Sequence, residues 1–169
     1  MIYVALGANL PNEHFGAPER TLPLVADYLD GNDINVKLRS RLYRSAPVPL
    51  TDDPWFINAV IGITSTLSPM LLLIRLLETE EKFGRKRSRQ NDPRSLDLDL
   101  LDYDGIILDE YDADRDIHLD LPHPRMFNRS FVLLPLVEIA PEWRHPVSKI
   151  AISELIKDLG EFKDISVLS

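Results

Sequence analysis

The sequence predicts a sandwich of helices and strands, of either the α/β or the α+β class. Segments with a helical hydrophobic period alternate along the chain with segments that suit strands. The links between them are short, and glycine or proline marks most boundaries. Such elements have to cover each other's apolar faces in layers. The chain has 169 residues, a length typical of one domain with its own core, so we expect a single domain over residues 1–169.

Strands are predicted where apolar or β-branched residues dominate a segment or alternate with polar ones. The expected strands are residues 2–6, 34–43, 55–66 and 96–103, with a short one at 106–108 after a turn at Gly105. Residues 10–18 and 44–54 contain several prolines and no clear period, so both are predicted to be loops.

Helices are predicted at residues 19–29, 69–83 and 150–159. Ser68 and Pro69 suit the N-cap and first position of the second helix, and Gly84 suits its end. Residues 125–128 are expected to form a short helical turn. The hydrophobic pattern of residues 131–139 does not decide which type of secondary structure they form. The last residues of the chain are expected to fray.

Composition and charge exclude several classes of function. The net charge of −8 argues against a nucleic-acid-binding surface, which would be basic. No apolar run reaches the ~20 residues of a membrane helix, and the first residues lack the basic start of a signal peptide, so we expect a cytoplasmic protein without membrane contact. The absence of cysteine excludes thiol chemistry. No glycine-rich phosphate-binding motif is present, so any ATP would be held by side chains.

Residues 84–101 carry the strongest chemical pattern. Two carboxylates, Asp97 and Asp99, alternate with leucines just after a run of cations, namely Arg85, Lys86, Arg87, Arg89 and Arg94. In a strand the two carboxylates share a face, with Cα atoms about 6.6 Å apart, and repel each other unless a cation lies between them. Carboxylates suit Mg²⁺ and arginines suit polyphosphates. The segment therefore predicts a site for Mg²⁺ and a nucleoside triphosphate, although an edge strand with a solvated acidic face beside a solvated basic loop fits the same pattern.

Several blocks of the sequence resemble one enzyme family. Residues 94–101 (RSLDLDLL), preceded by Pro93, resemble the signature of 6-hydroxymethyl-7,8-dihydropterin pyrophosphokinase of the folate pathway. Residues 5–10, 43–48 with 56–60, 121–126 and 129–136 resemble further segments of that family in the same order. The resemblance covers about residues 2–146. It implies an α+β fold, a ferredoxin-like αβα sandwich with a mainly antiparallel sheet and helices on both faces.

The resemblance also implies an activity and a nucleotide site. The family transfers the β,γ-diphosphate of ATP to the hydroxymethyl oxygen of the dihydropterin and releases AMP, and it works as a monomer. Two Mg²⁺ ions are expected at Asp97 and Asp99, and the implied catalytic residues are Arg85, Arg94, Asp97 and Asp99. The implied ATP-binding residues are Glu80, Arg85, Arg87, Arg89, Arg94, Leu100, His118, His123 and Arg129.

A pterin site is implied in the same way. Its residues would be Ser45, Val48, Phe56, Asn58, Asp97 and Phe131. Phe56 and Phe131 would stack on the two faces of the ring, although such residues would by default be expected in a hydrophobic core. Asp92, His118 and Asp120 depart from the family pattern, and the basic loop is one residue shorter, so the ATP contacts are expected to differ in detail.

Other function classes fit parts of the pattern. One is a relative that binds nucleotide or pterin without turnover, and another is an interaction protein with an acidic strand on its surface. A metal-dependent hydrolase would also need a base to activate water, and the sequence offers no assignable one beyond Asp97 and Asp99.

Overall fold

The computed structural model describes residues 1–31, 33–85, 94–160, 162 and 164–168. Its centre is a six-stranded sheet with the order β5-β1-β4-β3-β8, in which β2 also pairs with β4. Every strand pairing in this part of the chain is antiparallel. The strands of the sheet are β1 (Ile2–Ala8), β2 (Ile34–Arg39), β3 (Tyr43–Ser45), β4 (Phe56–Ser65), β5 (Asp97–Tyr103) and β8 (Ile165–Val167).

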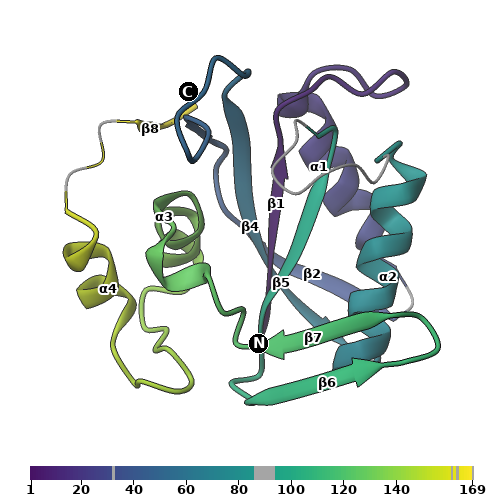
Figure 1. Ribbon diagram of the computed structural model, residues 1–169, viewed down its shortest axis with the longest axis vertical. Coiled ribbons are helices and arrows are strands. Elements are labelled where there is room, and N and C mark those ends of the chain that lie inside the picture. The colour runs from purple at the N-terminus through teal and green to yellow at the C-terminus, as the bar shows by residue number, and fades with distance from the viewer. Residues whose placement is uncertain (32, 86–93, 161, 163, 169) are drawn as a thin grey trace.

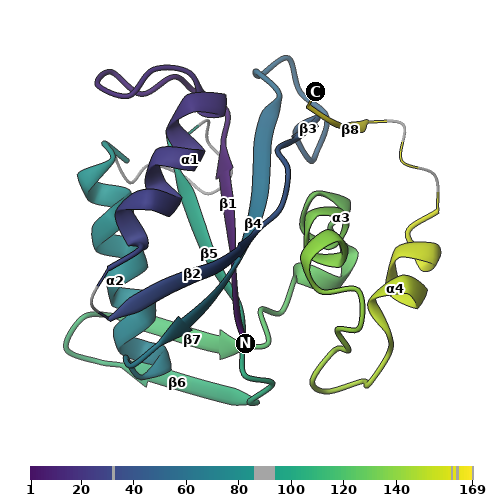
Figure 2. The ribbon, with the colours of Figure 1, turned by 180° about the vertical axis from the view of Figure 1, so that it is seen from behind.

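Helices cover both faces of this sheet, as Figures 1 and 2 show from opposite sides. The helices are α1 (Pro18–Leu29), α2 (Pro69–Lys82), α3 (Ser130–Ile139), α4 (Ile152–Asp158) and a 3₁₀ turn, η1 (Met126–Asn128). One core cluster joins α1 and α2 to the sheet, and a second joins α3 and α4 to the opposite face. The predicted α+β sandwich is confirmed.

The order of the elements explains how the sheet is built. The run β1-α1-β2-β4-α2-β5 folds into the spatial order β5-β1-β4-β2, which is the split βαβ arrangement of ferredoxin-like folds. A separate hairpin, β6 (Leu108–Asp112) with β7 (Ile117–Leu121), lies beside α2 in both views. None of the helices in the described segments combines the length and the apolar character needed to cross a membrane.

Local signals place α2 where the sequence predicts it. The Ser68 side chain accepts a hydrogen bond from the Leu71 amide at 3.4 Å, and Pro69 takes the first helical position. The helix ends before Gly84, whose φ of +77° suits glycine. Leu72 and Leu76 are fully buried against the sheet. The helix therefore has a fixed start, a fixed end and one apolar face.

The prediction of one strand over residues 34–43 was wrong. β2 ends at Arg39, and β3 starts at Tyr43 and runs to Ser45, inside the segment predicted to be a loop. The two strands pair with successive parts of β4, Ile61–Ser65 and Phe56–Asn58. Between them the Ser40 hydroxyl accepts a hydrogen bond from the Val60 amide at 3.0 Å. Pairing with a distant strand therefore decided this break.

The region after β5 also differs from expectation. The strand predicted at 106–108 is instead β6, and β7 follows it. β6 is rich in charged, exposed residues and has no apolar alternation, whereas β7 does alternate but has only five residues and was not predicted. Residues 131–139, whose type the sequence left open, form α3; the sheet on one side and α4 on the other bury much of this helix, which hides its period. The end of the chain does not fray throughout, because β8 pairs with β3.

The two faces of α2 predict different responses to truncation. Leu76→Ala should lower the free energy of unfolding by about 2–5 kcal/mol, because it leaves a cavity in the core. Leu71→Ala on the same helix should cost well under 1 kcal/mol, since Leu71 is 52% exposed. Urea denaturation of both variants measures the difference, and equal losses would contradict the assignment of the buried face.

Candidate active site

The strand register gathers the site residues on one face of the sheet. Asp97 on β5 lies opposite Gly7 on β1, and Gly7 lies opposite Asn58 on β4. Alternate residues of a strand share a face, so Asp99 and Phe56 project from this same face. A Cβ on Gly7 would lie 3.4 Å from Asn58 Oδ1 and 4.0 Å from Asp97 Cβ. Glycine at this position therefore leaves the space between the two polar side chains open.

Two arginines bind Asp97. Arg85 donates to Oδ1 at 2.8 Å, and Arg94 donates to Oδ2 at 2.9 Å. The Asn9 side chain accepts from the Arg94 amide at 2.7 Å and donates to the carbonyl of Pro54 at 3.1 Å. Asn9 is buried and thus fixes the backbone that carries Arg94. The resemblance had given Asn9 no role, although it lies in the first matching block.

Arg129 and His123 lie beside Asp99. Arg129 donates to Oδ2 at 3.3 Å, and His123 Nε2 lies 3.9 Å from the same oxygen. Burial raises the pKa of Asp99, and the charge of Asp97 raises it further. Burial also lowers the pKa of His123. The charge of Asp97 thus opposes the ionisation of Asp99, and a divalent cation between the two carboxylates would relieve that cost.

Glu80 ties α2 to the free edge of β5. It is only 2% exposed, and its carboxylate accepts from the Leu98 amide at 2.6 Å and from Arg85. β5 is an edge strand, and the Leu98 amide lies between the two aspartates in sequence. Burial raises the pKa of Glu80 to about 7 despite the nearby charge of Arg85. Glu80 therefore positions both the strand and one of the arginines that bind Asp97.

A cavity of about 300 Å³ lies along this edge. Its apolar walls come from α2, β5 and β7, and its polar lining includes many of the nucleotide-binding residues expected from the resemblance. Those lining residues are Glu80, Arg85, Asp97, Asp99, Leu100, His118 and His123. Arg94 and Arg129 reach the cavity through their bonds to the two aspartates. Arg87 and Arg89 lie outside the described residues.

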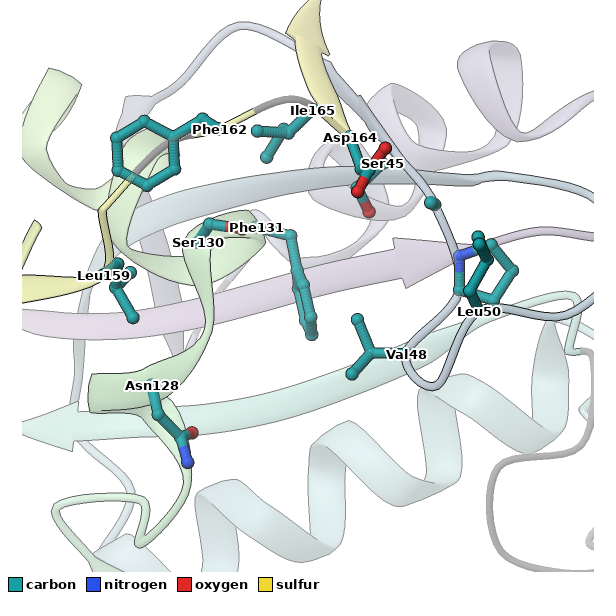
Figure 3. Close-up of a pocket in the computed structure, with 12 residues that line it drawn as sticks. Ser45, Val48, Leu50, Asn128, Ser130, Phe131, Leu159, Phe162, Asp164 and Ile165 are labelled. Carbon is teal, nitrogen blue, oxygen red and sulfur yellow. The ribbon is translucent and has the colours of Figure 1, made fainter.

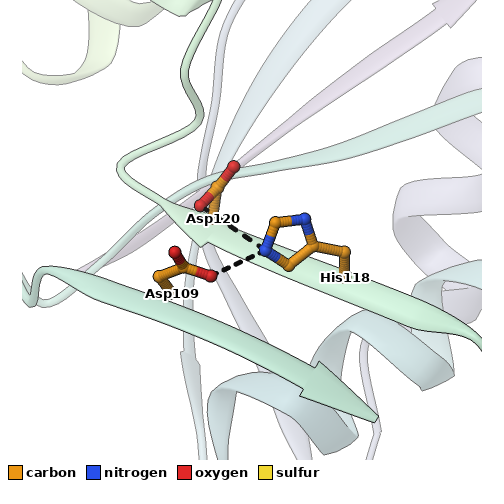
Figure 4. Close-up of side chains that lie close together, drawn as sticks. All are labelled: Asp109, His118 and Asp120. Carbon is orange, nitrogen blue, oxygen red and sulfur yellow. Dashed lines mark hydrogen bonds and ion pairs between the residues drawn. The ribbon is translucent and has the colours of Figure 1, made fainter. Parts of the chain in front are cut away.

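His118 and Asp120 lie on β7 at the rim of this cavity, as Figure 4 shows with Asp109 of β6. His118 Nε2 is 2.7 Å from Asp109 Oδ1 and 3.9 Å from Asp120 Oδ1. The hydrogen bond to Asp109 raises the pKa of His118, and Asp120 adds to the effect. Asp120, a departure from the family pattern, thus lies beside an imidazole whose protonated form is favoured by Asp109 and by Asp120 itself.

A second cavity, of about 490 Å³, opens beside the first residues of α3 (Figure 3). Ser45, Val48 and Phe131 line it, as expected for an acceptor site. Phe56 and Asn58 are not among its lining residues; Asn58 is buried and donates to Ser45 Oγ at 2.9 Å. The structure therefore brings three of the expected pterin residues together at this cavity and places Asn58 behind one of them.

The end of the chain supplies another wall of this cavity. Leu159, Phe162, Asp164 and Ile165 line it on the side of α4 and β8 (Figure 3). Nothing in the sequence indicated a role for them, because the matching blocks end before this segment.

Arg129 and Phe131 connect the two cavities. The guanidinium carbon of Arg129 lies 5.6 Å from the centroid of the Phe131 ring, and the same guanidinium binds Asp99. Phe131 faces the larger cavity, whereas Asp99 lines the smaller one. Burial lowers the pKa of Arg129, and Asp99 opposes this effect. Asp99 in the smaller cavity is thus linked through Arg129 to the aromatic ring in the larger one.

The raised pKa of Glu80 predicts how stability depends on pH. A buried carboxyl whose folded pKa exceeds its unfolded value binds an extra proton in the folded state, so stability falls as pH rises from about 4.5 to about 7. Relative to Glu80→Gln, the wild type should lose on the order of 3 kcal/mol over this window. Urea unfolding at a series of pH values measures it. Parallel curves for the two proteins would contradict the raised pKa, and Glu78→Gln on the exposed side of α2 is the control.

Comparison with known proteins identifies relatives of this chain. Residues 3–141 match the model of the family described as 7,8-dihydro-6-hydroxymethylpterin-pyrophosphokinase (HPPK). A 2-amino-4-hydroxy-6-hydroxymethyldihydropteridine pyrophosphokinase of Haemophilus influenzae is 36% identical over 98% of this chain and 96% of its own length. A protein of the same name from Synechocystis is 41% identical over 75% of this chain and 61% of its own length.

Solved structures agree with the fold. A Plasmodium falciparum HPPK-DHPS structure with pteroate matches 93% of this chain with a TM-score of 0.66 at 14% identity. This chain spans 42% of that longer protein. At this identity the match supports the fold alone, whereas the family match rests on the sequence. From both its sequence blocks and its matched length, the chain belongs to the 7,8-dihydro-6-hydroxymethylpterin-pyrophosphokinase family.

Proposed function

We propose that this protein transfers the β,γ-diphosphate of ATP to the hydroxymethyl group of 6-hydroxymethyl-7,8-dihydropterin, giving the pterin diphosphate and AMP in folate synthesis. The observation that carries the proposal is that Asp97 and Asp99 line one cavity and that Arg129 links Asp99 to Phe131, which lines a second cavity. One cavity is lined by cations and carboxylates, and the other contains an aromatic ring. A reaction between a polyphosphate and a flat acceptor needs both.

The smaller cavity is proposed to bind ATP. Its leucines, which include Leu73, Leu77 and Leu100, suit the nucleobase, and its cations suit the triphosphate. Arg85 and Arg94 both bind the Asp97 carboxylate, so phosphate oxygens beside that carboxylate would lie within their reach. His123 and Arg129 would add charge from the side of Asp99. Arg87 and Arg89 remain proposed phosphate contacts on the strength of the resemblance.

The donor set fits Mg²⁺. Asp97 and Asp99 share a face, the charge of Asp97 opposes the ionisation of Asp99, and hard oxygen ligands of this kind are the ones that Mg²⁺ prefers. We propose that they hold two Mg²⁺ ions, which when bound neutralise phosphate charge and lower the pKa of the attacking hydroxyl. Arg85 and Arg94 would keep Asp97 oriented, while Glu80 would hold the strand between the two ligands.

The larger cavity is proposed to bind the dihydropterin. Phe131 would stack on one face of the ring, and Ser45 and Val48 would line its edges. Phe56 and Asn58 project from the same face of the sheet and would complete the site from β4. We propose a monomeric enzyme, as the family resemblance implies.

The proposed chemistry is an in-line displacement at the β-phosphorus. The hydroxymethyl oxygen forms the new P–O bond, the bond from the β-phosphorus to the bridging oxygen of the α-phosphate breaks, and AMP leaves with that oxygen. The hydroxyl proton departs to solvent or phosphate. The residues of this site contribute positioning and charge neutralisation, which are the main contributions a protein makes to phosphoryl transfer.

Asp97→Asn tests both the proposed reaction and the role of Asp97 as a metal ligand. AMP formation from ATP and Mg²⁺ should require the dihydropterin, and the variant should reduce the rate by roughly a hundredfold or more, because a neutral amide cannot replace a charged metal ligand. Asp104→Asn, just beyond the same strand, is the control and should keep wild-type activity. Formation of ADP without pterin would instead indicate a hydrolase. The absence of any turnover would indicate a relative that binds nucleotide or pterin without catalysing a reaction.

Phe131→Ala tests the acceptor site. Loss of the ring should raise the KM for the dihydropterin by roughly tenfold or more, since stacking and apolar burial are both lost, while the KM for ATP stays unchanged. Phe127→Ala is a matched control, because Phe127 is an exposed aromatic residue a few positions earlier. An equal rise for both substrates would remove Phe131 from the acceptor site.

A further inference from the structure

The turn after β1 contacts both ends of the basic segment that joins α2 to β5. On the side of β5, the Asn9 and Leu10 amides donate to the Arg94 carbonyl at 3.0 and 3.2 Å. On the side of α2, the Asn12 side chain donates to the carbonyl of Phe83, the C-cap residue of the helix. The turn, the end of α2 and the start of β5 lie at the same end of the sheet in both views (Figures 1 and 2). This turn thus holds the chain where it leaves the helix and where it enters the strand.

The side-chain amide of Asn12 makes two kinds of hydrogen bond. Oδ1 accepts from the His14 and Phe15 amides at 2.8 and 3.1 Å, which stabilises the turn itself. Nδ2 donates to the Phe83 carbonyl and so links the turn to α2. Asn12 is only 6% exposed, so loss of a partner would leave a buried polar atom unsatisfied. The Phe15 and Phe83 rings lie 4.6 Å apart between centroids, and their packing reinforces the same link.

The carbonyl that Asn12 binds lies two residues before Arg85. Here α2 ends in a Schellman turn, in which the next two amides each donate to a carbonyl of the last helical turn at 3.0 Å. The Phe83 carbonyl is outside the hydrogen bonds of the helix, and Asn12 binds it, with the Ser95 hydroxyl as a more distant donor at 3.5 Å. Arg85 then donates to Asp97 at 2.8 Å. The contact from Asn12 therefore fixes the point from which Arg85 extends to the carboxylate.

We propose that Asn12 is a positioning residue for the diphosphate transfer, because it holds the end of α2 so that Arg85 reaches Asp97 and the phosphates of ATP. The inference rests on the proposed function, which makes those phosphates the target of Arg85. Asn12 is not among the lining residues of either cavity, so it acts through another residue. A misplacement of about 1 Å at a group that orients the reacting atoms can cost about a hundredfold in rate. A side chain that touches no substrate can therefore control this reaction.

Two substitutions separate the two kinds of hydrogen bond. Asn12→Asp and Asn12→Ser both keep an oxygen that can accept from the turn amides, and both lose the amide donor to Phe83. Each should lower kcat/KM for ATP by about tenfold to a hundredfold, measured as AMP formation with Mg²⁺ and 6-hydroxymethyl-7,8-dihydropterin. If Asn12→Asp, which adds a buried charge, does not fold, Asn12→Ser carries the same test. Asn35→Asp, at an exposed asparagine on β2, is the matched control and should keep the wild-type value.

A double-mutant cycle shows whether Asn12 acts through Arg85. If it does, Asn12→Ser should lower the rate of AMP formation in the wild type and add no further loss to Arg85→Ala. Single turnovers with enzyme in excess over ATP keep the slow variants measurable. Circular dichroism under the assay conditions checks that each protein in the cycle is folded.

Two results would overturn the inference and leave the proposed function intact. One is a wild-type rate in either folded Asn12 variant. The other is a loss that multiplies with that of Arg85→Ala, as a merely structural role of Asn12 would give. A wild type that forms no AMP with the dihydropterin would instead remove the proposed function itself, so the two failures are distinguishable.

Discussion

The structure depends on a constraint placed on β5. This edge strand buries Leu98 and Leu100 on one face and presents Asp97 and Asp99 on the other, and both faces must be satisfied at once. The leucines pack in the cluster that α1 and α2 form with the sheet. The carboxylates can remain ionised at low cost only if cations reach them. The rest of the site follows from how the fold buries the leucines and places cations beside the carboxylates.

α2, the helix that covers the leucines, also helps to stabilise the charged face of β5. From α2, Glu80 reaches around the strand edge to accept from the Leu98 amide, and Arg85 follows directly after the helix to bind Asp97. On the other side, Arg129 and His123 approach Asp99 from the segment before α3. Hydrophobic packing and charge pairing therefore use the same elements. A protein with a net charge of −8 concentrates positive charge at this one place, which focuses the field on a small polyanion.

The division into two cavities follows from the same geometry. The sheet face that carries Asp97, Asn58 and Ser45 is covered by α3 over only part of its length, and the larger cavity opens where this cover ends. The smaller cavity lies around the edge of β5, between α2 and β7. Arg129 links them, because its guanidinium binds Asp99 of the smaller cavity and lies 5.6 Å from the ring of Phe131 in the larger one. Under the proposed assignment each substrate has its own walls, and positioning supplies much of the catalysis.

The sequence alone determined the elements that carry a strong local signal, such as α2 with its Ser68 cap, and the alternation that puts Asp97 and Asp99 on one face. It also determined the family through its ordered blocks. Tertiary structure decided the rest. The break between β2 and β3 depends on pairing with β4, and the charged strand β6 has no apolar period to reveal it. The place of Asn58 behind Ser45 and of Asp164 in a cavity wall depends on contacts between residues far apart in the chain. Local sequence encodes propensity and period, whereas register and long-range hydrogen bonds arise only when the whole sheet assembles.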